Sequence, residues 1–224
     1  MLLEHRATSP YDPPVRDLVA EANHRIFNSL SAVAGMVQER IAALEAETAA
    51  ISVEEVRQML SEVRARVDAV TRFHRALATL PADATIDVGQ YLQQIAAELV
   101  TTLSPSGSVT LHFASELGCR AAPDRALYVG LAVVEIVINA LKYAHPTGIP
   151  GYIDIHCWST SNALVVEIAD DGVGFPDGFE PERTPTRGLV IVKSLIDQIG
   201  GTITFKSDGL GLTCTLSAPV LTLA

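Results

Sequence analysis

The first candidate for chemistry is a histidine on a stretch with helical periodicity. His24 shares one helix face with Asn28, four residues on, while Ile26 belongs to the opposite, apolar face. An exposed imidazole with a free ring nitrogen can attack phosphorus as a nucleophile. The plain alternative is a surface histidine beside an Arg25–Glu21 pair. The rest of the sequence has to decide between these interpretations.

The second candidate is a set of polar residues on an otherwise apolar helical stretch. Glu135, Asn139, Lys142 and Tyr143 recur at helical spacing and therefore lie on one face. Polar groups on such a helix are costly to bury unless the face lines a polar cleft. This pattern indicates a binding cleft, although a helix rim with a Glu/Asn hydrogen bond explains it as well when taken alone.

The third candidate is a glycine-rich turn, Asp170-x-Gly172-x-Gly174, which follows an apolar strand pattern. Glycines there let the backbone turn sharply against a ligand. Asp-Gly is also the commonest hairpin turn, which is the alternative interpretation. Further on, Gly188 and Leu189 open a predicted helix whose N-terminus can face an anion.

Composition places the chain among globular proteins and excludes several function classes. It has 224 residues, of which 48% are hydrophobic, so it can bury a core. The net charge of -10, with no basic cluster, disfavours nucleic acid as a partner. The longest apolar run, 126–141, is interrupted by Glu135 and Asn139, and residues 1–14 lack an apolar signal region. We therefore expect no membrane span and a cytoplasmic location.

Three widely spaced cysteines, Cys119, Cys157 and Cys214, show no CxxC pairing. That pattern argues against a disulfide framework or a structural zinc site. Buried reduced thiols are expected.

Residues 15–80 predict a helical hairpin that follows an N-terminal tail, 1–14. The segment has one glycine and no proline up to Leu80, and two apolar stripes at helical spacing. Ser52 with Glu54 and Glu55 indicates the start of the second helix. A lone hairpin cannot bury both stripes, so we expect a homodimer that forms a four-helix bundle. The stripes are Ile26, Leu30, Val33, Val37, Ile41 and Leu44, and then Val56, Leu60, Val63, Val67, Val70, Phe73 and Leu77.

Residues 84–224 predict a second region of alternating strands and helices. Helices are expected at 88–102, 123–144 and 188–199, and strands at 109–113, 119–121, 152–158, 164–170, 202–206 and 212–218. Helices packed against a mostly antiparallel sheet make an α+β sandwich. The fold class is therefore α+β, a helical hairpin followed by a sandwich.

Taken in order, these motifs resemble the HisKA_2 subfamily of histidine kinases with a GHKL-type ATPase domain. His24-Arg25-x-x-Asn28 resembles its H-box, in which arginine follows the histidine, and His74 resembles a second histidine common in the subfamily. Residues 87–99 resemble the segment that opens the ATPase domain. The likeness extends from about residue 15 to the C-terminus.

The resemblance implies a role for each polar residue of the second region. Asn139 would ligate Mg²⁺, Lys142 would approach phosphate, and Glu135 would order water or act as a base, all within an N-box that includes Tyr143. Asp170, with Gly172 and Gly174, would form the G1 box and accept a hydrogen bond from the adenine amino group. The implied cofactors are ATP and Mg²⁺.

The G2 region departs from the family pattern. The segment Thr186-Arg187-Gly188-Leu189 lacks the first glycine of Gly-x-Gly-Leu, and the preceding loop 175–186 contains three prolines. A shorter, stiffer nucleotide lid is expected. Arg183 and Arg187 could contact phosphates in its place, although arginines on exposed loops are commonly solvated.

The leading hypothesis is a two-component histidine kinase that autophosphorylates His24 and passes the phosphoryl group to an aspartate of a response-regulator receiver domain. Asn28 would orient water for the reverse, phosphatase reaction or hold His24 in place. Input would come from a sensor protein in trans, or the chain is an excised core. Two alternatives are a phosphotransfer adaptor with a non-catalytic ATPase domain and a GHKL serine kinase acting as an anti-sigma factor, which would leave the hairpin unused.

Overall fold

The computed structural model describes residues 30, 31, 33–35, 37, 38, 41, 42, 51–78, 84–104, 107–145, 149–183, 186–207 and 209–219. The described residues between 30 and 42 are helical. The predicted phosphoacceptor His24 and its neighbour Asn28 lie outside the described residues, as does the tail 1–14.

One layer of the molecule is a five-stranded sheet. The strands are β2 (Val109–Ser115), β4 (Gly151–Ser159), β5 (Ala163–Asp170), β6 (Thr202–Ser207) and β7 (Leu212–Pro219), in the spatial order β2-β4-β5-β7-β6. β2 runs parallel to β4, and the other three neighbouring pairs are antiparallel. Two short strands, β1 (Ile86–Asp87) and β3 (Arg120–Ala121), form a separate antiparallel pair. The predicted α+β class with a mostly antiparallel sheet is confirmed.

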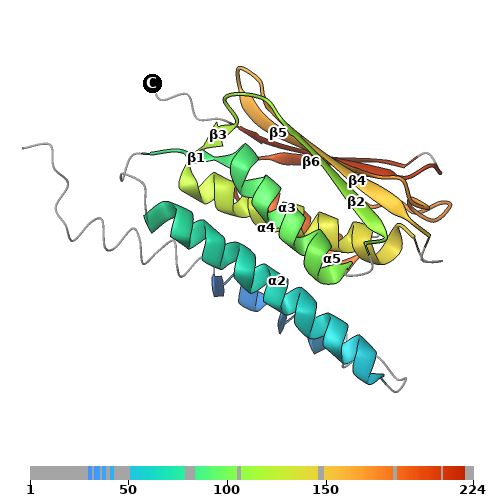
Figure 1. The fold of residues 1–224 in the computed structure, drawn as a ribbon. Helices are drawn as coiled ribbons and strands as arrows, with labels where there is room; N and C mark the ends of the chain where they lie inside the picture. The colour runs from blue at the N-terminus through green and yellow to red at the C-terminus, as the bar shows by residue number, and fades with distance from the viewer. Residues whose placement is uncertain are drawn as a thin grey trace, which may run out of the picture.

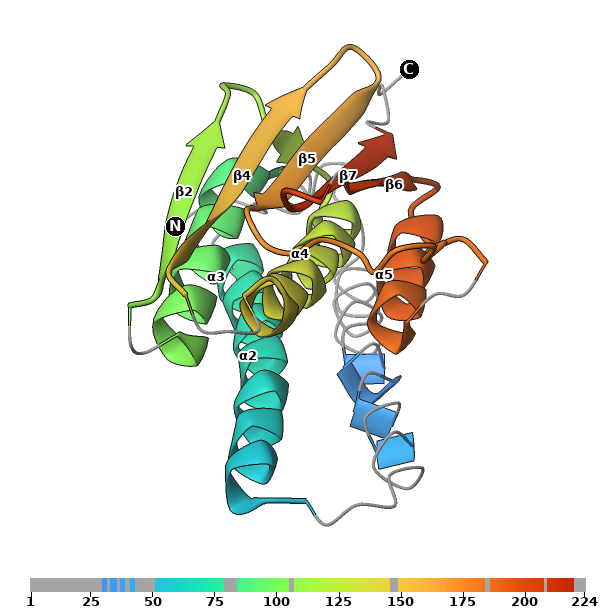
Figure 2. The same cartoon turned by 90° about the vertical axis from the view of Figure 1, so that its right-hand side faces the viewer.

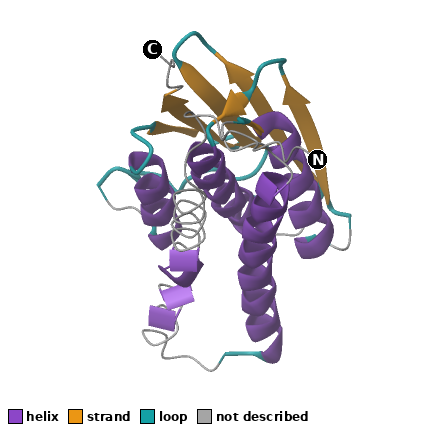
Figure 3. Cartoon of the chain, turned by 90° about the vertical axis from the view of Figure 1, so that its left-hand side faces the viewer, coloured by secondary structure: helices purple, strands orange, loops and turns teal. Residues whose placement is uncertain are grey.

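A layer of three helices covers one face of the sheet. α4 (Pro123–Tyr143) lies between α3 (Val88–Leu103) and α5 (Arg187–Asp197), as Figure 2 shows. The long helix α2 (Val53–Ala78) packs on the opposite side of this layer, against α3 and α4 (Figure 1). Its first turns extend beyond the layer (Figure 3). The hairpin's second helix is therefore docked onto the sandwich.

Local sequence signals set the helix ends. Ser52 and Glu55 form a capping box at the start of α2, because the Glu55 N–H donates to Ser52 Oγ at 3.2 Å and the Ser52 N–H donates to Glu55 Oε2 at 2.7 Å. Asp87 caps α3 by accepting from the Gln90 N–H at 3.0 Å. Pro123 occupies the first turn of α4, where its missing N–H costs nothing.

The core lies between α4 and the sheet. Leu127, Leu131 and Ile138 of α4 are fully buried, together with Ile153, Ile155 and Ile168 of the sheet. α4 is long and apolar enough to cross a membrane, but 72% of its most hydrophobic window is buried inside the protein, as in a core helix. The three cysteines are free and buried, which confirms that expectation.

The apolar stripe predicted for α2 is divided between two environments. Phe73 is fully buried against the sandwich, and Val70 is 6% exposed. Val56, Leu60 and Val67 face away from it and are 43%, 64% and 46% exposed. Among the described residues, the stripe therefore leaves an apolar strip exposed on α2.

Candidate functional site

A cavity of about 570 Å³ opens between α4, α5 and the C-terminal end of β5. Its volume lies in the range of small-molecule sites, roughly 300 to 1,000 Å³. It is lined by apolar side chains with a few polar groups, and it includes these sequence-predicted residues: Glu135, Asn139, Lys142, Tyr143, Asp170, Gly174, Gly188 and Leu189. The helix face predicted to border a cleft does so.

The end of β5 contributes a half-buried carboxylate. Asp170 Oδ1 accepts hydrogen bonds from the Gly172 N–H at 3.0 Å and the Leu212 N–H at 3.3 Å. Burial raises the pKa of Asp170 above its usual value, against the lowering effect of these two backbone donors. Both hydrogen bonds that this carboxylate accepts from described residues use Oδ1, and Asp170 lines the cavity.

Close backbone approach explains the glycines of this turn. A Cβ at Gly172 would lie 2.4 Å from Ala144 Cα and from Ala144 O. Gly174 has a positive φ of 66°, and a Cβ there would lie 2.8 Å from Gly211 O. The turn is therefore pressed against the end of α4 on one side and the start of β7 on the other.

A second aspartate fixes the turn to the end of α4. Asp171 Oδ1 accepts from the Tyr152 N–H at 2.8 Å and lies 2.8 Å from His145 Nε2. Desolvation opposes ionisation of Asp171, but the Tyr152 donor and His145 outweigh it and lower its pKa. The Val173 N–H also donates to Ala144 O at 2.9 Å. Sequence reasoning missed this connection, because His145 follows the predicted helix without any motif of its own.

The first turn of α5 lies beside Asn139. A Cβ at Gly188 would lie 3.2 Å from Asn139 Nδ2, so glycine keeps the space around this amide open. Leu189 is buried. Arg187 begins α5, and its side chain lies outside what the structure describes. Arg183 pairs with Glu180 at 2.9 Å on the exposed loop, which fits the solvated alternative better than a phosphate contact.

Two charged side chains in the second half of α4 contact partners from α2. Glu135 is 2% exposed, and both of its carboxylate oxygens accept from Arg66, with Arg66 Nη2 at 2.8 Å from Oε2. Lys142 Nζ lies 2.9 Å from Glu62 Oε1 and 5.5 Å from the centroid of the Tyr143 ring. Glu62 and Arg66 thus line the cavity, although no sequence motif marked them.

The residues present fit a magnesium nucleotide. The half-buried Asp170 carboxylate suits an amino group of a purine, and the part of the cavity beside Asn139 at the N-terminus of α5 suits phosphates. Asn139 Oδ1 is an oxygen ligand of the type that Mg²⁺ accepts. Within the described residues, no cluster of three or more histidine, cysteine or acidic side chains could hold a metal by itself. Mg²⁺ would therefore be held jointly by Asn139 and the phosphates.

The Gly172 contact gives a direct test of this turn. Gly172→Ala should weaken ATP binding and lower the free energy of unfolding by about 1 to 3 kcal/mol, because the added methyl group overpacks the site. Gly35→Ala is the matched control, since a Cβ there meets nothing within 4 Å. Urea denaturation and calorimetric titration with ATP measure the two effects. A Gly172→Ala protein as stable as the wild type would show that this close approach is not required.

An α+β sandwich in which a half-buried carboxylate after one strand and a polar helix face line the same cavity defines a nucleotide-binding ATPase domain. Residues 95–217 match the family described as the histidine kinase-like ATPase domain, and residues 21–103 match the HisKA_2 histidine kinase family. The chain belongs to the histidine kinase-like ATPase family and carries the adjoining HisKA_2 region. An ATPase domain of this family implies ATP binding.

Several curated proteins and solved structures are similar to this chain. The sensor histidine kinase PdtaS of Mycobacterium tuberculosis is 28% identical over 179 residues, which are 80% of this chain and 34% of that protein. Blue-light-activated histidine kinase 2 of Erythrobacter litoralis is 24% identical over 207 residues, 90% of this chain and 57% of that protein. The chain therefore spans about a third to just over half of these relatives.

The fold also matches a solved histidine kinase domain. That domain, from an Erythrobacter litoralis blue-light-activated histidine kinase, superposes with a TM-score of 0.68 at 23% identity, covering 92% of this chain and 94% of that one.

Proposed function

We propose that this chain is the phosphotransfer and ATP-binding part of a two-component histidine kinase. It would transfer the γ-phosphoryl group of Mg·ATP to His24 and then to an aspartate of a receiver domain. The observation that carries the proposal is the cavity, which Asp170 and Asn139 line together with Gly188 at the N-terminus of α5. The HisKA_2 match over residues 21–103, a range that includes His24, supports the proposal.

The reaction requires mainly positioning and charge neutralisation. A His24 ring nitrogen would attack the γ-phosphorus, the bond to the β,γ-bridging oxygen would break, and ADP would leave. Asp170 would orient the adenine, Lys142 and the N-terminus of α5 would stabilise phosphate charge, and Glu135 would accept the imidazole proton. Mg²⁺ held at Asn139 would neutralise phosphate charge when bound.

Two observations favour the second candidate, a phosphotransfer adaptor that does not use ATP. The G2 segment lacks its first glycine, and Glu135 and Lys142 are both paired with α2. Isothermal titration with Mg·ATP separates the candidates. Saturable binding supports the kinase, and its absence supports the adaptor.

The uncovered strip on α2 predicts a homodimer. Val56, Leu60 and Val67 are spaced at helical intervals and are 43%, 64% and 46% exposed in the single chain, and an apolar patch of this kind indicates a partner surface. Light scattering should give about twice the chain mass of 23.9 kDa. The double variant Leu60→Glu/Val67→Glu should give the single-chain mass. A wild-type protein that stays monomeric at micromolar concentration would contradict this prediction.

A further inference from the structure

Two buried ion pairs join α2 to the cavity wall. Glu62 pairs with Lys142, and their side chains are 4% and 17% exposed; Arg66 pairs with Glu135, and theirs are 11% and 3% exposed. We call these two pairs the ionic clasp. All four residues line the cavity. The clasp therefore lies inside the candidate nucleotide site and not at its margin.

The spacing of the four residues shows how the helices meet. Glu62 and Arg66 are one turn apart on α2, whereas Glu135 and Lys142 are two turns apart on α4. The earlier residue of α2 pairs with the later residue of α4, so the helices cross in opposite chain directions at this point. Because Glu135 and Lys142 are further apart than Glu62 and Arg66, the two α2 side chains must diverge to reach them.

The clasp occupies the charged groups that nucleotide chemistry would use. Both carboxylate oxygens of Glu135 accept from the Arg66 guanidinium. Burial would lower the pKa of Arg66, but hydrogen bonding to Glu135 outweighs it and the net shift is upward. The Lys142 ammonium already faces a carboxylate at 2.9 Å. In this state both Glu135 oxygens are occupied by Arg66, and the Lys142 charge is already paired, so it offers less attraction to phosphate.

A buried ion pair is stable only while the contact between the two helices keeps both partners in place. Removing one partner leaves the other charge uncompensated in a low-dielectric site, which is strongly unfavourable. A ligand that takes Lys142 away from Glu62 leaves Glu62 in that position. Such a ligand therefore weakens the docking of α2.

We propose that Glu62 and Arg66 are positioning residues of the nucleotide site and that nucleotide phosphates compete with the clasp. With the clasp closed, α2 is docked and Lys142 and Glu135 are neutralised; phosphates that bind Lys142 open it and free Glu135. By linkage, opening the clasp favours nucleotide to the same extent that nucleotide favours opening. This inference rests on the proposed function for its nucleotide half and on the described ion pairs for its docking half.

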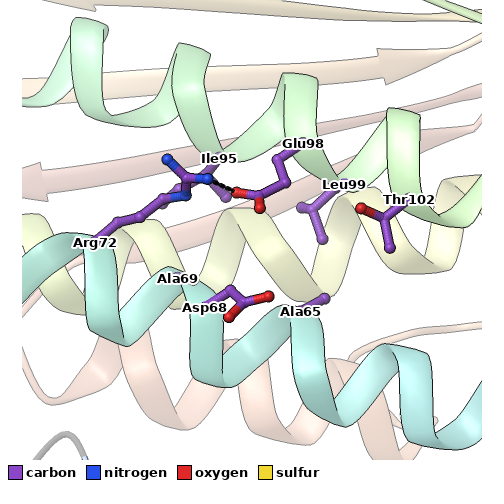
Figure 4. Close-up of a pocket in the computed structure, with 8 residues that line it drawn as sticks. All are labelled: Ala65, Asp68, Ala69, Arg72, Ile95, Glu98, Leu99 and Thr102. Atoms are coloured by element: carbon purple, nitrogen blue, oxygen red, sulfur yellow. Dashed lines mark ion pairs between the residues drawn. The ribbon is translucent and has the colours of Figure 1, made fainter.

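A third ion pair provides a control outside the cavity. Arg72 of α2 pairs with Glu98 of α3, at a small hollow that also has Asp68 and Thr102 at its rim (Figure 4). The two side chains are 39% and 36% exposed, so this pair contributes little to docking. Glu98→Gln changes an α2 ion pair without touching the nucleotide site.

The test measures the distance between α2 and the sandwich with and without ligand. Spin labels at Val53→Cys and Leu117→Cys would be read by double electron–electron resonance, with excess unlabelled chain to suppress signals between subunits. Both positions are highly exposed, and the three native cysteines are buried. The ligands are adenylyl imidodiphosphate with Mg²⁺ and, as the matched control, adenosine, which fills a base pocket but carries no phosphates.

If phosphates open the clasp, the triphosphate analogue should change the distribution of distances between the two spin labels, and adenosine should not. Glu62→Gln and Arg66→Gln should show the changed distribution without ligand, whereas Arg66→Lys and Glu98→Gln should keep the wild-type one. Calorimetry should show Glu62→Gln binding the analogue at least about fivefold more tightly.

Two results overturn the inference. One is that calorimetry shows binding of the analogue while the distance between the two spin labels stays unchanged. The other is a wild-type distance in both Glu62→Gln and Arg66→Gln. If no nucleotide binds at all, the proposed function fails instead, and the distances in these two variants still decide whether the clasp holds α2.

Discussion

His24→Ala should abolish phosphorylation of the chain by γ-labelled ATP, to below detection, while ATP affinity stays at the wild-type value. Alanine removes the imidazole proposed to attack the γ-phosphorus, whereas the proposed nucleotide contacts at Asp170 and Asn139 stay intact. Autoradiography of the purified protein and calorimetric titration measure the two properties.

His74→Ala is the matched control for that experiment, because His74 lies on α2. Its ring contacts the Phe73 ring edge-on, with 5.4 Å between the two ring centroids. We expect this variant to keep the label. Label that persists in His24→Ala, at His74 or elsewhere, would show that the phosphoacceptor is a different residue.

Asp170→Asn should weaken ATP binding roughly 5- to 150-fold, which corresponds to about 1 to 3 kcal/mol for a buried hydrogen-bonding group left without its partner. The variant keeps the size of the side chain, but an amide nitrogen would oppose either the adenine amino group or the backbone donors of Gly172 and Leu212. Calorimetry is the measurement, with Asp177→Asn on the exposed loop as the control.

The pH dependence adds an independent check on Asp170. Burial raises the pKa of this carboxyl, so it takes up a proton at a higher pH than an ordinary aspartate does. When the pH is lowered, the ATP affinity of the wild type should therefore begin to fall before an ordinary aspartate would titrate. Asp170→Asn should lose that dependence. An Asp170→Asn protein with wild-type affinity at neutral pH would remove Asp170 from the adenine site.

Most of the fold could be predicted from the sequence, because its elements are long and strongly periodic. The helix expected at 123–144 is α4, Pro123–Tyr143, and the strand expected at 164–170 is β5, Ala163–Asp170. Ser52 marked the start of α2 correctly, since the capping box is a local signal. The strand β1 was missed, because two residues carry no readable period.

The apolar face of α2 was predicted only in part. Helical spacing assigned Val56, Leu60 and Val67 to the same stripe as Val70 and Phe73, but α4 and α3 cover only the later part of it. The sequence does not show where the sandwich docks along the hairpin. That position depends on tertiary contacts such as the ion pair between Arg66 and Glu135.

The cavity residues that belong to sequence motifs were predicted, whereas the cavity residues outside any motif were not. Asn139 and Asp170 border the cavity as expected. The partners Glu62 and Arg66 were not found, because a glutamate and an arginine four residues apart look like an ordinary pair within one helix. Only the packing of α2 on α4 shows that each reaches across to an opposite charge.

The most direct test of the central claim is the chemical stability of the label. The purified chain would be incubated with γ-labelled ATP and Mg²⁺ and then exposed to acid or to base. A histidine kinase should carry label that is lost in acid and survives base, as expected for a phosphorus–nitrogen bond. A chain that binds ATP yet takes up no label, or carries label that survives acid, would contradict the account.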